Sequence, residues 1–304
     1  PYIDWFKRSY SYYSNPETGV VTKVDLGYCL TPEEVDVRQK AIDDALKPFL
    51  DTIESRMSDY EVVLRAYNYI IDLVDYDSIG LDIQKKDADA DEKPDDLRSV
   101  YGVFVNRKTV CAGYSVALQY LLNLLGIECT YVRGMSGSDF TEYHGWNMLK
   151  LEGDYYFMDV TWGDGSNTQA EKHFSDKISY DYFCITSEEL SIDHKIEEEL
   201  PVPECTATKC NYYHRHGLYF DTYDFDNIRN TICREIDKGS TEIALRCIDI
   251  SLRDEFVNKL CNDGKLYDII RYSNLKSDVR LNTSFRYSTS DKKATLKFFL
   301  ERSK

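Results

Sequence analysis

Several functional classes are excluded by what this sequence lacks. The 304 residues contain no run of about 18 apolar residues, so no segment predicts a transmembrane helix. Positive charge is also scarce, because 37 Lys and Arg face 53 Asp and Glu and the net charge is −16. So acidic a surface repels nucleic-acid backbones and anionic membranes, and its simplest role is solubility. We therefore expect neither nucleic acid nor a membrane span, and the sequence leaves the oligomeric state open.

The nine cysteines lack the spacing of a metal site or of a disulfide framework. No CxxC pair occurs, and an odd number leaves at least one thiol without an intrachain partner. A bridge between Cys205 and Cys210 would close a short loop, and we do not favour it. The acidic stretch from Asp87 to Asp96 begins like a calcium loop but lacks its glycine and its final carboxylate. We interpret this stretch as a solvated loop and predict no metal and no cofactor.

The start of the chain bears on its compartment. Residue 1 is Pro and not Met. We expect a mature fragment that has lost a targeting segment, which favours an extracellular or cell-surface location for a secreted protein. Residues 1–30 are rich in tyrosine, show no clear periodicity and are expected to be irregular.

Helical signals follow this irregular start. Capping boxes at Thr31-Pro32-Glu33-Glu34 and at Ser58-Asp59-Tyr60-Glu61 each open an apolar pattern of helical period. Pro48 should kink the first of these helices. A third, buried helix is expected after Cys111, and Gly126 ends it.

Strand signals follow the third helix. Strands are expected at 127–132, 145–151 and 155–161, with a small polar loop over 134–143 and a hairpin turn at Gly153-Asp154. Residues 163–210 show little periodicity, and two prolines within them indicate a connector.

The last hundred residues predict a separate small unit. Alternating and helical patterns from residue 218 onwards give the order β-α-β-α-β-β, which is long enough to bury a core of its own. The expected fold class is therefore α+β, with a larger domain over residues 1–204 and a smaller α+β accessory domain over 205–304.

Cys111 is the first candidate for chemistry. It lies at the expected start of a helix, where unpaired N–H groups and the helix dipole favour the thiolate, the form of cysteine that attacks. Taken alone, such a cysteine is more often a buried structural residue. A second residue is needed to make it a nucleophile.

His144 and Asp159 supply the missing groups. His144 opens a predicted strand, in the sequence His144-Gly145-Trp146-Asn147, and a cysteine and a histidine together form a minimal nucleophile and base. Asp159 is a polar residue in an apolar strand and needs a partner there. Across a hairpin the two side chains can share a face, but a turn at Gly153-Asp154 places them four residues out of register.

The other four histidines give a weaker signal. Residues 173, 194, 214 and 216 lie in expected loops or at the ends of elements. The pair His214 and His216 has no third ligand nearby in sequence, so zinc binding is not predicted.

Three ordered blocks resemble the motifs of the transglutaminase-like superfamily in its bacterial form. The resemblance covers about residues 55–165 and implies a papain-like core, with the cysteine on a central helix and the histidine and aspartate on adjacent strands. Gly145 departs from the alanine that is more usual after the histidine. The blocks are Val110-Cys111-Ala112-Gly113-Tyr114, His144-Gly145-Trp146-Asn147 and Tyr156-Phe157-Met158-Asp159-Val160-Thr161-Trp162.

The resemblance assigns a role to each residue of the set. It implies Cys111 as nucleophile, His144 as general base and acid, and Asp159 as the residue that orients the histidine. In animal members an upstream tryptophan helps to stabilise the oxyanion. Here we nominate Tyr76 and the backbone N–H of Cys111 for that role. We expect Trp146 and Trp162 to line the substrate cleft.

The expected function is thioester chemistry on peptide or amide bonds. We favour hydrolysis, as in a cysteine peptidase or amidase acting on a protein or peptide substrate, because no calcium site of the animal type is evident. One alternative is a transglutaminase that crosslinks or deamidates proteins. Another is an inactive transglutaminase-like module that only binds proteins. Fold and triad alone do not choose between these.

Overall fold

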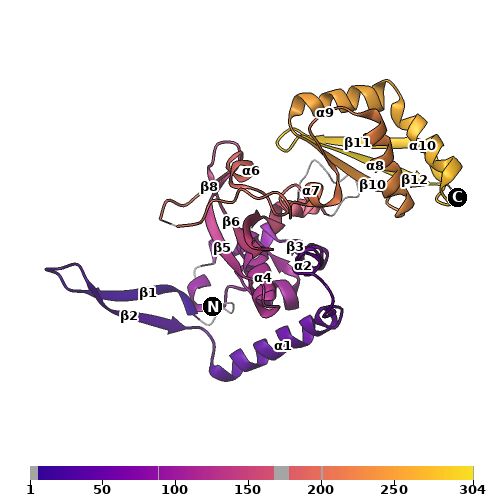
Figure 1. The fold of residues 1–304 in the computed structure, drawn as a ribbon. Coiled ribbons are helices and arrows are strands. Elements are labelled where there is room, and N and C mark those ends of the chain that lie inside the picture. Colours follow the sequence, from indigo (N-terminus) through magenta and orange to yellow (C-terminus); the bar gives the residue numbers. More distant parts are fainter. Residues whose placement is uncertain (1–5, 88, 168–177, 200, 304) are drawn as a thin grey trace. The chain divides into compact units, whose positions relative to one another are not determined.

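The chain folds into two compact units. A computed structural model describes residues 6–87, 89–167, 178–199 and 201–303. The first unit comprises Pro1–Ala207 and the second comprises Thr208–Lys304 (Figure 1). None of the helices in the described ranges is long and apolar enough to cross a membrane. All nine cysteines lie in these ranges, and none of them, Cys205 and Cys210 included, takes part in a disulfide bond.

The N-terminal segment is a β-hairpin, so the expectation of an irregular start was wrong. Strands β1 (Phe6–Ser14) and β2 (Val21–Tyr28) pair antiparallel, with Tyr10 opposite Leu26 and Tyr12 opposite Val24. These four side chains are exposed and alternate with polar residues, so the period-2 signal was present but was masked by the many tyrosines.

Both predicted capping boxes are confirmed. The side chains of Thr31 and Ser58 accept hydrogen bonds from the backbone N–H groups of Glu34 and Glu61. Each glutamate carboxylate in turn accepts from the backbone N–H of its N-cap residue. Pro48 lies in the last turn of its helix, close to the C-terminal end where the helix stops anyway. The two helices are α1 (Pro32–Leu50) and α2 (Asp59–Leu73).

A group of short elements leads from α2 to the central helix. Among them, β3 and β4 form a two-residue parallel pair, which ties the end of α2 to the residues just before Cys111. The elements are β3 (Asp75–Tyr76), α3 (Ser78–Lys86), η1 (Ala90–Glu92), η2 (Asp96–Arg98), η3 (Gly102–Asn106) and β4 (Lys108–Thr109).

The core of the first unit is an antiparallel sheet of four strands, in the order β7-β6-β5-β8. Helix α4 packs against β5 and β6 (Figure 1). The helix and strands are α4 (Cys111–Leu124), β5 (Cys129–Ser136), β6 (Glu142–Leu151), β7 (Asp154–Met158) and β8 (His194–Ile196). The remaining elements are α5 (Val160–Gly163), η4 (Gly165–Asn167) and α6 (Ser187–Ser191).

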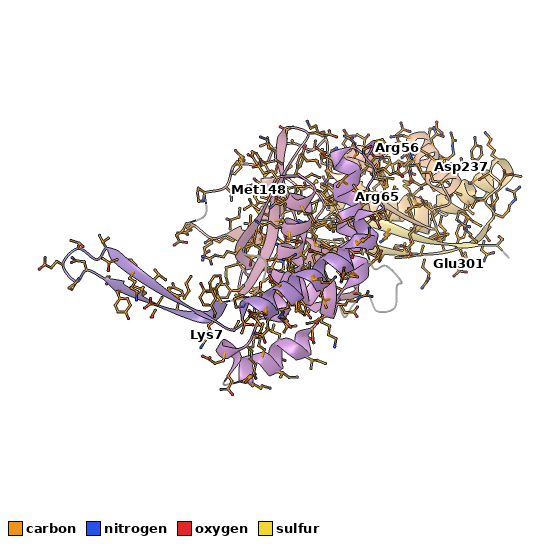
Figure 2. All side chains as sticks on the ribbon, turned by 90° about the horizontal axis from the view of Figure 1, so that it is seen from below. Lys7, Arg56, Arg65, Met148, Asp237 and Glu301 are labelled. Atoms are coloured by element: carbon orange, nitrogen blue, oxygen red, sulfur yellow. The ribbon has the colours of Figure 1, made fainter. Side chains whose placement is uncertain are left out.

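The segment after β7 covers part of this sheet, although its sequence has little periodicity. Trp146 and Phe157 from the strands are buried against Tyr182, Ile185 and Leu190 from that segment. Met148 on β6 packs against the same cluster, and Figure 2 marks its position. A sequence without a period can therefore still supply one side of a core.

From β9 onwards the second unit follows the predicted β-α-β-α-β-β order, except that the second helical part is divided into α9, η5 and α10. Its sheet has the order β11-β12-β10-β9, in which only the short β9–β10 pair is parallel. A short helix, α7 (Tyr212–His216), precedes the first strand and carries His214 and His216. The other elements are β9 (Tyr219–Phe220), α8 (Phe225–Asp237), β10 (Glu242–Cys247), α9 (Ile250–Phe256), η5 (Val257–Asn262), α10 (Lys265–Lys276), β11 (Leu281–Ser290) and β12 (Thr295–Arg302).

Candidate active site

Cys111 is the first residue of α4. The residue before it, Val110, makes no side-chain cap, so no side chain there competes for the N–H groups of the first turn. Gly113 allows this turn to lie close to β4, because a Cβ atom there would meet Thr109 Oγ1 at 1.8 Å. That hydroxyl donates to the carbonyl of Leu97 at 2.7 Å. The half-buried thiol thus lies at a helix start whose position is fixed by neighbouring backbone.

Two polar side chains fix the helix that carries Cys111 to the strand that carries His144. The Ser115 hydroxyl is 2.8 Å from the carbonyl of Gly145 and 3.0 Å from that of Cys111. In return, the Asn147 amide donates to the carbonyl of Ser115 at 2.9 Å. Ser115 and Asn147 are both buried, so these bonds form away from water.

His144 and Asp159 lie in direct contact. His144 Nε2 is 2.7 Å from Asp159 Oδ2. The register of the hairpin, which differs from the predicted one, brings the two residues closer together. Leu151 pairs with Asp154, so the two turn residues are Glu152 and Gly153, with φ of 50° and 93°, and not Gly153-Asp154.

This register halves the expected offset between the two residues. Asn147 pairs with Met158, so continuing the ladder would place Asp159 opposite Trp146, two residues from His144 rather than four. The predicted strand over 155–161 also ends earlier, because Asp159 is the N-cap of α5 and its Oδ1 accepts from the N–H of Trp162 at 3.1 Å. The chain leaves the strand at Asp159, which brings its carboxylate to the histidine.

The electrostatics favour an ionised pair. Burial alone disfavours a charged imidazole, but the Asp159 carboxylate and the hydrogen-bonded Cys111 sulfur outweigh it and raise the pKa of His144. Burial likewise disfavours an ionised Asp159, yet His144 and His194 outweigh it and lower the pKa of that carboxyl. Since Nε2 of His144 faces Asp159, Nδ1 is the ring nitrogen left for Cys111.

Tyr76 lies beside Cys111. It pairs in parallel with Thr109, and Asp77 N–H donates to the Thr109 carbonyl at 2.8 Å. The backbone of Cys111 lies close enough to the Tyr76 hydroxyl to affect its pKa. Burial, and to a lesser extent the neighbouring Cys111, raise the pKa of Tyr76, so its hydroxyl keeps a proton that it can donate.

The two tryptophans occupy different places from those expected. Trp146 is completely buried in the core cluster, and neither it nor Trp162 belongs to the cleft lining. Their rings instead lie against the histidines: the ring centroid of Trp162 is 5.6 Å from that of His144 and 4.5 Å from that of His194. The expectation for Trp146 failed because this side chain, on the same face of β6 as His144, lies two residues further along the strand, where Tyr182, Ile185 and Leu190 cover it.

Gly145 has a structural explanation. A Cβ atom at this position would lie 2.5 Å from the Tyr131 hydroxyl and 2.6 Å from its ring. The side chain of Tyr131 therefore fills the space that an alanine would need, and it lines the cleft beside His144.

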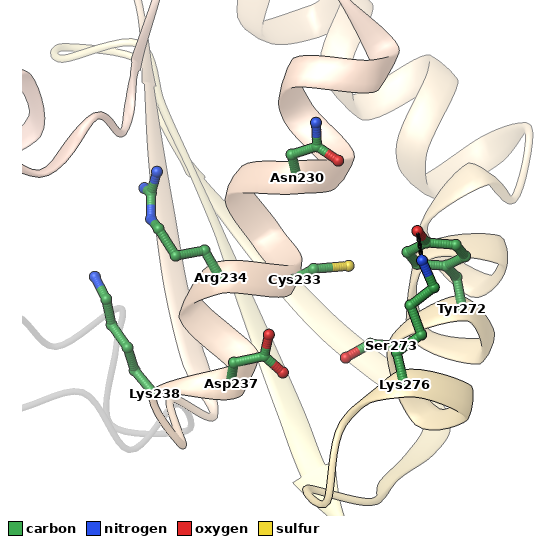
Figure 3. Close-up of a pocket in the computed structure, with 8 residues that line it drawn as sticks. All are labelled: Asn230, Cys233, Arg234, Asp237, Lys238, Tyr272, Ser273 and Lys276. Atoms are coloured by element: carbon green, nitrogen blue, oxygen red, sulfur yellow. Dashed lines mark hydrogen bonds between the residues drawn. The ribbon is translucent and has the colours of Figure 1, made fainter.

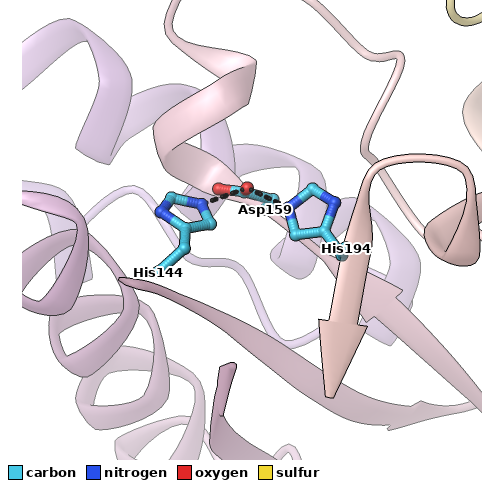
Figure 4. A group of neighbouring side chains, drawn as sticks. All are labelled: His144, Asp159 and His194. Atoms are coloured by element: carbon cyan, nitrogen blue, oxygen red, sulfur yellow. Dashed lines mark hydrogen bonds and ion pairs between the residues drawn. The ribbon is translucent and has the colours of Figure 1, made fainter. Parts of the chain in front are cut away.

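His194 was not predicted to belong to the site. It is buried on β8, and its Nε2 is 3.1 Å from Asp159 Oδ2 (Figure 4). Few sequence signals point to it, because β8 has only three residues. A capping box at Thr186 and Glu189 and the acid–histidine pair Asp193-His194 were available as hints. His173 lies outside the described residues.

The sulfur and the imidazole open onto a cleft of about 780 Å³. The cleft lies within the first unit and is lined by apolar, aromatic and charged side chains of both signs. Besides Cys111, His144 and Tyr76, its walls include Tyr131, Met135, Tyr143, Lys195 and Glu197.

A second cavity, of about 500 Å³, lies between α8 and α10 in the other unit (Figure 3). It also contains a thiol, Cys233, but burial raises the pKa of this group and no histidine lines the cavity as described. The combination of thiol and imidazole distinguishes the first cleft. The second is lined by Asn230, Cys233, Arg234, Asp237, Lys238, Tyr272, Ser273 and Lys276.

One group of side chains has the composition of a metal site. Among the described residues, only His144, Asp159 and His194 form such a group, with ligand atoms within 4.8 Å of one another. Direct hydrogen bonds already join these atoms. An ion would have to take the imidazole nitrogen that holds Asp159, so metal binding and the His144–Asp159 contact exclude each other.

Comparisons with known proteins identify the same segment. The sequence model of the Transglutaminase-like superfamily matches residues 48–160. Kyphoscoliosis peptidase from Homo sapiens is 29% identical over 183 residues, which is 56% of this chain and 26% of that protein. The Mus musculus protein is 30% identical over the same length and coverage. The match thus spans about a quarter of these relatives, and both are mammalian, so the bacterial form stays a prediction.

Solved structures give more distant matches. A structure described as a TGase aligns with a TM-score of 0.36 and 19% identity, over 49% of this chain and 39% of that one. A putative cysteine protease from Cytophaga hutchinsonii aligns with a TM-score of 0.29 and 15% identity, over 50% and 61%. The family assignment rests on the sequence matches and on the three motif blocks within them. Residues 48–160 of this chain form a domain of the transglutaminase-like superfamily.

Proposed function

We propose that the chain is a thiol enzyme that cleaves peptide or amide bonds through a thioester on Cys111. The observation that carries this proposal is that Cys111 and His144 line the same 780 Å³ cleft, and that Asp159 holds His144 from behind at 2.7 Å. A nucleophile, a base and a group that orients the base are the minimal set for acyl transfer.

The arrangement of these side chains supports the following proton path. His144 Nδ1 takes the thiol proton, and the thiolate attacks the carbonyl carbon of the substrate. When the C–N bond breaks, the imidazolium returns this proton to the departing amine and leaves an acyl group on the sulfur. His144 then takes a proton from water as the water attacks the thioester, which releases a carboxylic acid and restores the thiol. Asp159 holds the imidazole in the required tautomer and stabilises its charged form.

The tetrahedral intermediate needs donors for its oxygen. The backbone N–H of Cys111 and the hydroxyl of Tyr76 already lie together, and both can donate. An oxyanion placed between them would accept from both, which supports these two groups as the oxyanion hole.

Hydrolysis is supported over transfer to an amine by the relatives. Both curated proteins that the chain matches bear the name peptidase. Transfer to an amine remains a second outcome of the same thioester and has to be measured separately. We further propose that the second unit, from Thr208 onwards, is an accessory domain.

Labelling with an electrophile tests the proposal. Iodoacetamide at neutral pH, followed by peptide mapping, should modify Cys111 faster than the other eight cysteines. Cys111→Ala should abolish hydrolysis of a denatured-protein or peptide-library substrate, whereas the matched control Cys233→Ala should retain it. A fluorescent primary amine added to the same reaction measures transfer. Unmodified Cys111 beside labelled thiols elsewhere, or a fully active Cys111→Ala variant, would refute the mechanism.

A further inference from the structure

A second histidine lies on the far side of the Asp159 carboxylate. His194 stands on the edge strand β8, opposite Ser136 of β5. Its Nε2 is 3.1 Å from the Oδ2 atom that also faces His144 Nε2 at 2.7 Å. Figure 4 shows the two rings on opposite sides of the carboxylate. One oxygen of Asp159 is therefore shared between two imidazoles.

This second bond completes the fixation of Asp159. Its Oδ1 accepts from the N–H of Trp162 at 3.1 Å, and its Oδ2 accepts from both rings. With three donors on two oxygens, the plane of the carboxylate is determined. Without His194, Oδ2 would be held only by His144, the residue that has to move a proton. An orienting group is most effective when it is itself held by groups outside the reaction.

His194 is in turn held by a buried chain of polar groups. Its Nδ1 is 2.7 Å from Asp193 Oδ1, and the Tyr182 hydroxyl donates to Asp193 Oδ2 at 2.6 Å. Both ring nitrogens face carboxylate oxygens, so the ring is held from two sides. The rings of Trp162 and Trp146, with centroids 4.5 Å and 4.9 Å from that of His194, shield these bonds from water.

We propose that His194 is a positioning residue of the cysteine site: through Asp159 it fixes the orientation of His144 towards Cys111. This inference rests on the proposed function. His194 does not line the cleft, so it acts on the thiol through Asp159 and His144 and not on the substrate. Its removal should lower the reactivity of Cys111 while leaving substrate binding unchanged.

The rate of Cys111 alkylation by iodoacetamide, measured from pH 5 to 9 by mass spectrometry, tests this role. We expect His194→Ala to lower the rate at neutral pH by about tenfold to a hundredfold, the range for loss of one hydrogen bond to a charged group. The pH of half-maximal reactivity should move upward, towards that of an ordinary cysteine. His194→Gln, whose amide can still donate to Asp159, should retain part of the rate.

A control and a second position separate positioning from packing. Ser136→Ala changes a buried polar residue directly opposite His194 and should keep both the rate and the pH profile. Asp193→Asn weakens the hydrogen bond at Nδ1 of His194 and should lower the alkylation rate less than His194→Ala does. If His194→Ala does not fold, as judged by circular dichroism, the glutamine variant and Asp193→Asn carry the test.

The outcomes distinguish the two proposals. If His144→Ala leaves the wild-type profile unchanged, the proposed function fails. If His144→Ala changes it but folded His194 variants keep the wild-type rate and profile, only the role of His194 fails. The same profile after EDTA treatment supports hydrogen bonding. Loss of reactivity on chelation would overturn the positioning role in favour of a metal bound by His144, Asp159 and His194.

Discussion

Replacing Asp159 by asparagine should separate the geometry of the site from its charge. The amide has one acceptor and one donor group where the carboxylate has two acceptors. If its oxygen keeps the bond to the Trp162 N–H, its NH₂ group faces both histidines. His144 must then accept at Nε2 and carry its proton on Nδ1, the nitrogen that faces Cys111. In this tautomer the imidazole cannot take the thiol proton.

The opposite orientation of the amide is also unfavourable. Its oxygen would face the histidines, but the NH₂ group would oppose the Trp162 N–H and leave that donor unsatisfied, which costs about 1–3 kcal/mol. Either way the imidazolium loses its counter-charge. We expect hydrolysis and Cys111 alkylation to fall by about a thousandfold to ten-thousandfold, as in serine protease triads in which this carboxylate becomes an amide. That range corresponds to about 4–5.5 kcal/mol of barrier.

The assay compares Asp159→Asn with Asp164→Asn. Asp164 is equally buried and accepts from the Tyr114 hydroxyl at 2.7 Å, so its change disturbs a neighbouring carboxylate outside the histidine network. Single-turnover release from a peptide substrate and the alkylation rate should both collapse in Asp159→Asn only. A folded Asp159→Asn enzyme within tenfold of wild type, or an equal loss in the control, would refute the assignment of Asp159.

Two further predictions concern stability. The Asp159 pKa lies below its ordinary 3.8, and the His144 pKa lies above its ordinary 6.5. The stability contributed by ionised Asp159 is therefore lost as pH falls, and the stability contributed by charged His144 is lost as pH rises. The unfolding free energy lost in Asp159→Asn should thus be largest between about pH 4 and 6.5 in urea titrations, and a constant loss from pH 3 to 9 would contradict this linkage. Gly163→Ala should cost about 1–3 kcal/mol in the same assay, because the new Cβ would lie 1.7 Å from the hydroxyl of buried Tyr67. Adding Tyr67→Phe should recover part of that loss, and no recovery would place the strain elsewhere.

Much of the fold was predictable where local signals decide it. The capping boxes at Thr31 and Ser58 fix two helix starts through bonds within four residues. In the second unit, helix α8 (Phe225–Asp237) likewise starts at a capping Asp224 and ends shortly before a glycine, Gly239, so local signals delimit it. Such elements need no information from distant parts of the chain.

The contacts between the site residues were harder to predict, because they depend on strand register and on segments whose sequence has no periodic pattern. A one-residue error in the turn, at Glu152-Gly153, doubled the apparent offset between His144 and Asp159. His194 escaped notice because three residues of edge strand carry no periodic signal, and its place is set by pairing with β5. Trp146 was assigned to the cleft from its neighbour in sequence, whereas the segment that carries Tyr182, Ile185 and Leu190 covers it.

The cleft rim and the buried hydrogen-bond network are formed by different residues. The network governs the reactivity of Cys111, whereas the rim influences whether water or an amine takes the acyl group. Asp159 and His194 lie beneath the site, whereas Lys195 and the glutamates after it form the rim. The rim charges largely neutralise one another, since Arg133 pairs with Glu197 and Lys195 lies 3.9 Å from Glu198. A rim without a strong acidic field does little to concentrate an ammonium group beside the thioester, while water needs no such recruitment. This balance supports the proposed hydrolysis over amine transfer.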